Sequence, residues 1–150
     1  METKTEGIDI RNRKARFDYQ ILERFIAGIV LTGSEIKSVR NGKVSLSDSY
    51  CFFRNGELFI KNLQISEYEK ASYNNHDPLR ERKLLLKKVE LRRLQKELAN
   101  QISTIVPLRI FTSKSGYAKI EIASAKGKKD HDKREDLKKK DIERETQRRF

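Results

Sequence analysis

The side chains best suited to acid–base chemistry are two histidines, and each is followed by an aspartate: His76 by Asp77 and His131 by Asp132. A histidine beside a carboxylate can serve as a general base when it faces a nucleophile. No serine or cysteine lies in a recognisable nucleophile motif. Both histidines stand in polar stretches, so we predict solvated side chains and no catalytic residue. Base stacking or phosphate contact is the functional alternative for either ring.

Residues that bind metals or nucleotide phosphates do not form a motif. Gly127-Lys128-Lys129 lacks the upstream glycine of a phosphate-binding loop. The single cysteine, Cys51, excludes an internal disulfide and a multi-cysteine zinc site, and its aromatic neighbours predict a buried, inert thiol. The aspartates that a two-metal nuclease would have to gather are far apart in the sequence: Asp48, Asp77 and Asp132. We therefore predict no metal and no cofactor.

The basic side chains indicate a function more clearly than the histidines, the cysteine or the aspartates do. The chain of 150 residues has 34 Lys and Arg against 22 Asp and Glu, a net charge of +12. Residues 11–16 hold four basic side chains and no acidic one, and a second basic cluster spans residues 80–93. This pattern is typical of a protein that binds a polyanion. Nucleic acid fits better than anionic lipid, because residues 125–150 lack the apolar face of an interfacial helix. A merely solvated charged surface is the other alternative.

The distribution of charged and apolar side chains divides the chain into a domain and a tail. Residues 125–150 contain 11 basic and 7 acidic side chains, and their sizeable apolar residues are only Leu137, Ile142 and Phe150. Such a segment cannot offset the entropy cost of ordering itself. We predict a barrel domain over residues 1–124, with 1–10 flexible, and a basic tail over 125–150. Acidic-before-basic pairs four residues apart favour a helix when a partner orders the tail.

Elements that would position these residues follow from the pattern of apolar side chains. Alternation over residues 17–31 predicts one long strand with a bend or bulge near Gly28. Thr32 and Glu35 form a capping-box pattern, which predicts a short helix that stops at Asn41-Gly42.

The rest of the chain predicts two hairpins and a second helix. Asn55-Gly56 joins strands at 48–53 and 57–63, and a second hairpin joins 105–112 to 117–123. Residues 67–78 are predicted to form a loop, and a helix of about 14 residues ends before Ser103. Short antiparallel strands remove their edges by closing, so we expect a mainly β fold, an OB-like antiparallel barrel with embedded helices.

Four tyrosines could contribute aromatic surface. Tyr19 lies on the apolar face of the first long strand and is predicted to belong to the core. Tyr68, Tyr73 and Tyr117 are candidates for stacking on bases or nucleosides. No apolar run is long enough to span a membrane, and no apolar stretch follows the N-terminus as in a secretory signal. We expect a soluble, cytoplasmic RNA-binding protein.

Five motifs extend this interpretation, because together they resemble the SmpB family, the SsrA-binding proteins of bacterial trans-translation. The matching segments run in order through the chain: Asn12-Arg13-Lys14-Ala15-Arg16; residues 27–38; Leu46-Ser47-Asp48-Ser49-Tyr50; Asp77-Pro78 with residues 82–86; and residues 125–129 followed by 131–134. The resemblance covers about residues 10–145. It implies an OB-like barrel that binds the tRNA-like domain of transfer-messenger RNA (tmRNA).

The resemblance also implies the partners and the action. The complex enters the A site of a ribosome stalled on a truncated message, with elongation factor Tu involved indirectly through charged tmRNA. The tail becomes helical in the empty mRNA channel, past the decoding centre of the small subunit. The protein is then an adaptor without catalytic activity. A general ribosome-associated RNA-binding protein is the alternative; a nuclease or a basic membrane-surface protein fits the residues less well.

The resemblance assigns roles to individual residues. Contacts to tmRNA map onto Asn12, Ile26, Leu86 and Lys119, beside the basic residues Arg13, Lys14 and Arg16. Leu86 belongs to a run of leucines that could instead lie in the core. Ile26 departs from the family, which usually carries Glu there, so that contact is absent or passes to Glu23 or Arg24. The tail residues expected at the decoding centre are Lys126, Gly127, Lys128, Lys129, His131, Asp132, Lys133 and Arg134. Gly127 would supply a hinge, Lys133 and Arg134 would contact phosphates, and His131 would stack on a base.

Overall fold

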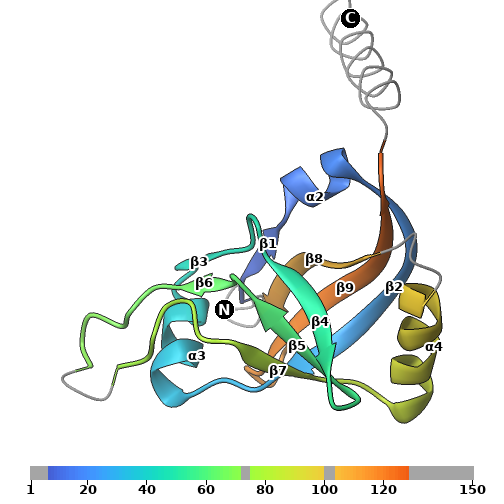
Figure 1. Cartoon of the computed structure of the whole chain (residues 1–150). Coiled ribbons are helices and arrows are strands. Elements are labelled where there is room, and N and C mark those ends of the chain that lie inside the picture. Colours follow the sequence, from blue (N-terminus) through green and yellow to red (C-terminus); the bar gives the residue numbers. More distant parts are fainter. Residues whose placement is uncertain (1–6, 72–74, 100–103, 129–150) are drawn as a thin grey trace, which may run out of the picture.

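A computed structural model describes residues 7–71, 75–99 and 104–128 (Figure 1). Its elements in chain order are β1 (Asp9–Arg11), α2 (Arg13–Asp18), β2 (Tyr19–Ile29), α3 (Gly33–Arg40), β3 (Val44–Ser45), β4 (Tyr50–Arg54), β5 (Glu57–Lys61), β6 (Gln64–Ile65), β7 (Arg82–Leu85), α4 (Lys88–Ala99), β8 (Thr104–Thr112) and β9 (Ala118–Gly127). Some predictions concern residues outside these ranges, namely Tyr73, Lys129, His131, Asp132, Lys133 and Arg134.

The strands form a closed antiparallel barrel. The sheet runs in the order β1-β8-β4-β5-β7-β2-β9, and β9 also pairs with β8, which closes the ring. β3 and β6 form a separate two-stranded sheet. Closure leaves few unpaired edges, which is the physical reason that short antiparallel strands adopt it. The predicted mainly β barrel with embedded helices is confirmed.

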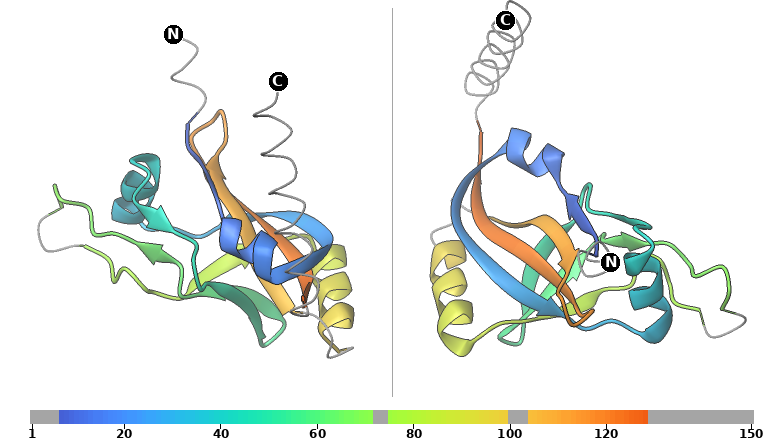
Figure 2. Two further views of the ribbon diagram at one scale, coloured as in Figure 1. Left: turned by 90° about the horizontal axis from the view of Figure 1, so that it is seen from above. Right: turned by 180° about the vertical axis from the view of Figure 1, so that it is seen from behind.

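Strand alternation builds the core. On β2, Phe25, Ala27 and Ile29 point inward and are buried, while the residues between them face outward. The inward side chains of the other barrel strands complete one apolar cluster, and Leu94 of α4 packs into it fully buried. A second, smaller cluster forms around Ala15 of α2 and Leu108 of β8. The helices α3 and α4 lie at opposite sides of the barrel (Figure 2).

Local signals in the sequence account for the turns. The Thr32 side chain accepts a hydrogen bond from the Glu35 backbone, and the Glu35 carboxylate accepts one from Thr32 N at 2.8 Å, so the capping box is confirmed. Asn55 and Gly56 both have positive φ, 53° and 78°, as the tight hairpin between β4 and β5 requires. Cys51 is buried as predicted, and burial raises the pKa of its thiol.

Four features differ from the prediction. Residues 13–18 form the helix α2, so the long strand begins at Tyr19 instead of residue 17. Its irregularity lies between Ile21 and Glu23, not near Gly28. Residues 82–85 form strand β7. Arg82 and Leu84, two positions apart, are both buried, which is the alternation of a strand, and the helical spacing of α4 begins only after them. The strand β9 also continues to Gly127, beyond the expected end of the barrel domain at 124.

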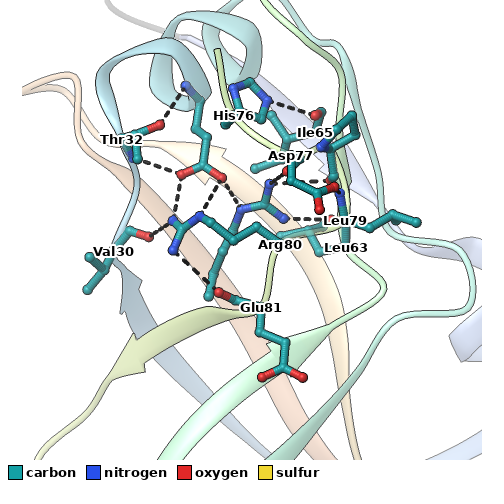
Figure 3. A network of polar contacts seen from close by, with 12 residues as sticks. Val30, Thr32, Leu63, Ile65, His76, Asp77, Leu79, Arg80 and Glu81 are labelled. Atoms are coloured by element: carbon teal, nitrogen blue, oxygen red, sulfur yellow. Dashed lines mark hydrogen bonds and ion pairs between the residues drawn. The ribbon is translucent and has the colours of Figure 1, made fainter. Parts of the chain in front are cut away.

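A buried ion cluster holds the loop between β6 and β7 against α3 (Figure 3). Glu35 and Arg82 are fully buried, and Arg82 Nε lies 2.5 Å from Glu35 Oε2. Arg80 Nη2 lies 2.6 Å from Glu35 Oε1. Arg82 also donates to the carbonyl of Leu63 at 2.7 Å. Burial raises the pKa of Glu35, but the hydrogen bonds from Arg80, the Thr32 backbone and Arg82 outweigh it and lower that pKa from 4.5 to about 2.

The prediction of a solvated His76 is wrong. Its ring is buried, Nδ1 lies 2.9 Å from Ser34 Oγ, and Nε2 lies 2.8 Å from the Ile65 carbonyl oxygen. Polar neighbours in the sequence hid this, because the loop folds back onto Ser34 of α3 and Ile65 of β6, which supply a partner to each ring nitrogen. His76 thus fastens the loop to α3 and β6.

Candidate nucleic-acid interface

The helix α2 presents the first basic run, and Asn12 holds it in place. The Asn12 side chain accepts a hydrogen bond from Ala15 N at 3.2 Å, which caps the helix. Its amide nitrogen donates to the carbonyls of Pro107 at 3.0 Å and Leu46 at 3.3 Å. Both side-chain polar atoms are therefore engaged within the protein, and the side chain is buried. In the structure Asn12 positions α2, and the tmRNA contact that the family resemblance assigns to it stays a prediction.

The three basic side chains of α2 are exposed. Arg13, Lys14 and Arg16 face solvent, while Ala15 between them packs on the smaller apolar cluster. Lys14 Nζ lies 2.7 Å from Asp48 Oδ1 in an exposed ion pair, and the hydrogen bond with its charge attraction raises the pKa of Lys14. Such an exposed pair contributes little to stability. The cations of α2 thus stay available to an anionic partner.

The end of β9 brings further basic residues to α2 (Figures 1 and 2). Gly127 pairs with Tyr19 and Lys126 with Gln20, so the last residues of β9 lie beside the start of β2. Lys128 N donates to the Asp18 carbonyl at 3.0 Å, and its Nζ reaches the Arg16 carbonyl at 3.3 Å. Residues more than a hundred positions apart therefore form one basic surface, which we call the α2 surface: Arg13, Lys14, Arg16, Lys126 and Lys128.

A second surface lies on the outside of β2. Leu22, Ile26 and Val30 are exposed apolar side chains, and 44 % of Ile26 is accessible. Gly28 stands between Lys119 of β9 and Leu85 of β7 in the strand register. Leu85 side-chain atoms approach within 3.5 to 4.0 Å of the place where a Cβ of residue 28 would lie. A shallow apolar strip with a lysine at its edge results, which we call the β2 surface: Ile26, Gly28, Val30, Leu85 and Lys119.

Leu85 faces outward, whereas the family resemblance assigns the tmRNA contact to its neighbour Leu86. Leu85 is 51 % exposed, whereas Leu86 is half-buried and packs against the main core. Strand alternation from the buried Leu84 would have indicated this, had residues 82–85 been recognised as a strand. Ile26 and Lys119 do lie close together, since their strands are paired.

The second basic cluster divides into two groups. Arg80 and Arg82 are bound to Glu35 and hold the loop, as described above. On α4, Arg92 and Arg93 are exposed, and Arg93 Nη1 lies 2.7 Å from Glu23 Oε1 on β2. The exposed Lys87, Arg92 and Arg93 therefore add positive charge to the surface, whereas the buried Arg82 does not.

The tyrosine predictions have different outcomes. Tyr19 is half-buried against the smaller apolar cluster. Tyr117 is 72 % exposed at the β8–β9 turn, and Tyr68 is half-buried, with Lys37 Nζ 5.5 Å from its ring centroid. Among the described residues, no group of three or more His, Cys, Asp or Glu side chains could hold a metal ion. None of the helices described is long and apolar enough to cross a membrane.

Comparison with known proteins decides the family. A profile described as SmpB protein matches residues 9–150. The chain belongs to the SmpB family. The SsrA-binding protein of Cytophaga hutchinsonii is 55% identical over 150 residues, which cover 99% of this chain and 98% of that protein. The SsrA-binding protein of Enterococcus hirae is 52% identical over 138 residues, covering 92% and 89% respectively.

A solved structure of the SmpB family has the same fold. It is described as "tmRNA-SmpB: a journey to the center of the bacterial ribosome", and it superposes with a TM-score of 0.69 at 51% sequence identity. The match covers 81% of this chain and 85% of the other. The closed barrel is therefore the SmpB fold.

Proposed function

We propose that this chain is the RNA-binding adaptor of trans-translation in its organism. It binds the tRNA-like domain of tmRNA and delivers it to the A site of ribosomes stalled on truncated messages. Similarity to SsrA-binding proteins over nearly the whole chain supports this function. The observation that carries it is the α2 surface, where two distant basic segments meet at the point from which the tail leaves the barrel. The protein acts in the cytoplasm and catalyses no reaction.

The β2 surface supplies the shape-dependent part of tmRNA binding. Its apolar strip packs against riboses or unstacked bases, and Lys119 meets a phosphate. Ile26 accepts no hydrogen bond, and Glu23 is already paired with Arg93. Arg24, exposed on the same face of β2 as Ile26, is the neighbour that can provide a polar contact. The α2 surface adds phosphate contacts through Arg13, Lys14 and Arg16.

The tail provides the contact with the ribosome. Lys126, Gly127 and Lys128 lead out of the barrel, and the following residues are proposed to reach the decoding centre and mRNA channel: Lys129, His131, Asp132, Lys133 and Arg134. A charged segment of this composition pays its ordering entropy when it meets ribosomal RNA. Elongation factor Tu takes part through charged tmRNA, without a required contact to this chain.

Titration with labelled tRNA-like domain tests the tmRNA contact. Near physiological salt we expect tight binding that an excess of elongator tRNA does not displace. Equal, weak binding of both RNAs would overturn the adaptor function. It would favour a general ribosome-associated RNA-binding protein. Such a protein would co-sediment with translating ribosomes and with message-depleted ones alike.

Truncation after Lys128 tests the division of labour. This end point keeps all of β9, whereas a cut after Ala123 would remove residues paired with β2 and β8. We expect the affinity for the tRNA-like domain to stay within a few-fold and peptide tagging on stalled ribosomes to be lost. A large loss of RNA affinity, or tagging at the full-length rate, would contradict the proposed role of the tail.

A further inference from the structure

The outward face of the β4–β5 hairpin carries three neighbouring aromatic rings, Tyr50, Phe52 and Phe59, which we call the ring cluster. Phe52 on β4 is opposite Phe59 on β5, and Tyr50 is opposite Lys61. The ring centroids of Tyr50 and Phe52 are 6.3 Å apart, and those of Phe52 and Phe59 are 5.9 Å apart in a stacked arrangement. Cys51, between Tyr50 and Phe52, points into the core. The rings therefore lie on the outside of the barrel.

Arg54 lies over two rings of this cluster. Its guanidinium carbon is 5.1 Å from the Phe52 centroid and 5.4 Å from the Phe59 centroid. Glu81 holds Arg54 Nη2 at 3.0 Å, yet the side chain of Arg54 remains 53% exposed. A guanidinium fixed on aromatic rings is a flat, preorganised surface on which a nucleobase can stack.

Tyr50 connects the ring cluster to a groove. The groove has a volume of about 360 Å³ and lies between α2 and the start of β4. Tyr19 and Tyr50 both line it, together with Lys14 and Ser49. Tyr50 is 39% exposed, so its ring is accessible from solvent. Aromatic surface and hydrogen-bonding groups thus continue from the hairpin towards the cations of α2.

Stability of the hairpin explains only part of this arrangement. A cross-strand pair such as Phe52 and Phe59 stabilises a sheet, but that role requires neither an exposed Tyr50 nor an arginine over the rings. Carboxylates do face the area: Glu81 pairs with Arg54, Glu57 with Lys83, and Asp48 with Lys14. These pairs are partly or largely exposed, and exposed pairs are weak. An RNA phosphate can therefore replace the carboxylate beside a lysine or arginine.

We propose that Tyr50, Phe52, Arg54, Phe59 and Lys61 form a stacking face that binds unpaired nucleobases of a single-stranded RNA segment. The proposal rests on the RNA-binding function above and adds a second site to it, on β4 and β5 instead of α2 and β2. Stacking on aromatic rings tolerates any base, so this face holds a single strand without reading its sequence.

Two RNA probes separate stacking from charge attraction. One is a labelled oligoadenylate of about ten nucleotides, and the other is an abasic strand of the same length. Both carry the same phosphates, so the +12 charge of the protein attracts them equally. We expect the wild-type chain to bind the oligoadenylate about 5- to 100-fold more tightly, as aromatic stacking of one base provides.

Conservative variants then locate the preference. Tyr50→Leu and Arg54→Lys keep bulk or charge and remove a stacking plane, so each should reduce the preference for the base-bearing strand several-fold. The matched controls are Phe53→Leu, on the inward side of the same strand, and Arg92→Lys on α4. Neither control should change the preference.

Titration of the tRNA-like domain with the same variants keeps the two proposals distinguishable. Unchanged affinity for that domain together with a lost base preference supports the stacking face. A wild-type chain that binds the tRNA-like domain but shows no base preference, or variants that keep the preference, would overturn it. Displacement of the oligoadenylate by the tRNA-like domain would also overturn it as a separate site. Failure of the wild-type chain to bind the tRNA-like domain would instead refute the proposed function.

Discussion

Two arginine-rich segments of this chain have opposite roles. Arg13 and Arg16 stand exposed on α2, whereas Arg80 and Arg82 are bound to the buried Glu35. In the sequence both segments look like parts of an RNA-binding surface. In the structure the first is held outward by Asn12 and the second holds a loop in place. A count of basic residues therefore overestimates the surface that is available to RNA.

Removal of the buried negative charge should have the largest effect. Glu35→Gln leaves Arg82 fully buried without its counter-charge, so we expect the free energy of unfolding to fall by about 3–5 kcal/mol. Urea denaturation at neutral pH measures this loss. Glu67→Gln is the matched control, because Glu67 is exposed in the loop between β6 and β7. It should change stability by less than about 0.5 kcal/mol. A loss for Glu35→Gln as small as that of the control would contradict the structural role of the cluster.

Acid should act on the same cluster. The pKa of Glu35 is lowered from 4.5 to about 2 in the folded protein, so the folded state binds fewer protons than the unfolded state in this range. The stabilisation from this group is complete above about pH 4.5 and is lost as the pH falls towards 2. The difference in unfolding free energy between wild type and Glu35→Gln should therefore shrink over that interval. A constant difference between pH 6 and pH 2.5 would refute the assignment.

Two neighbouring leucines provide a comparison at smaller scale. Leu86→Ala removes a half-buried side chain from the core and should cost about 1–2 kcal/mol of stability with little change in RNA affinity. Leu85→Ala, on the exposed β2 surface, should change stability by less than about 0.5 kcal/mol and weaken binding of the tRNA-like domain several-fold. Thermal unfolding and RNA titration of both variants check this. If Leu86→Ala weakened RNA binding and Leu85→Ala did not, the RNA contact would belong to Leu86.

Local patterns made much of the fold predictable from the sequence. The capping box at Thr32 and the Asn55-Gly56 turn depend on interactions within a few residues, and both were identified correctly. The family motifs covered the rest of the barrel, since they span most of the chain. The helix at residues 13–18 was missed because Phe17 and Tyr19 continue the alternation of the strand that follows.

Long-range contacts account for what the sequence did not reveal. The burial of His76 depends on Ser34 and Ile65, which lie 42 and 11 positions away. The polar atoms of Asn12 are satisfied by Leu46 and Pro107, which no local pattern connects to it. The proximity of Lys128 to Arg16 likewise requires the closed barrel. Residue type predicted the chemistry of these side chains, but only the fold determines whether they face RNA or the protein.

The most direct test of the account is the salt dependence of tRNA-like domain binding by the triple variant Arg13→Gln, Lys14→Gln, Arg16→Gln beside wild type. These side chains are exposed, so the variant should keep its stability and lose affinity at moderate salt. The slope of log affinity against log salt should become shallower by about 1 for each lost phosphate contact, or about 3 in all. An unchanged slope and affinity would show that α2 does not contact RNA and would contradict the central claim.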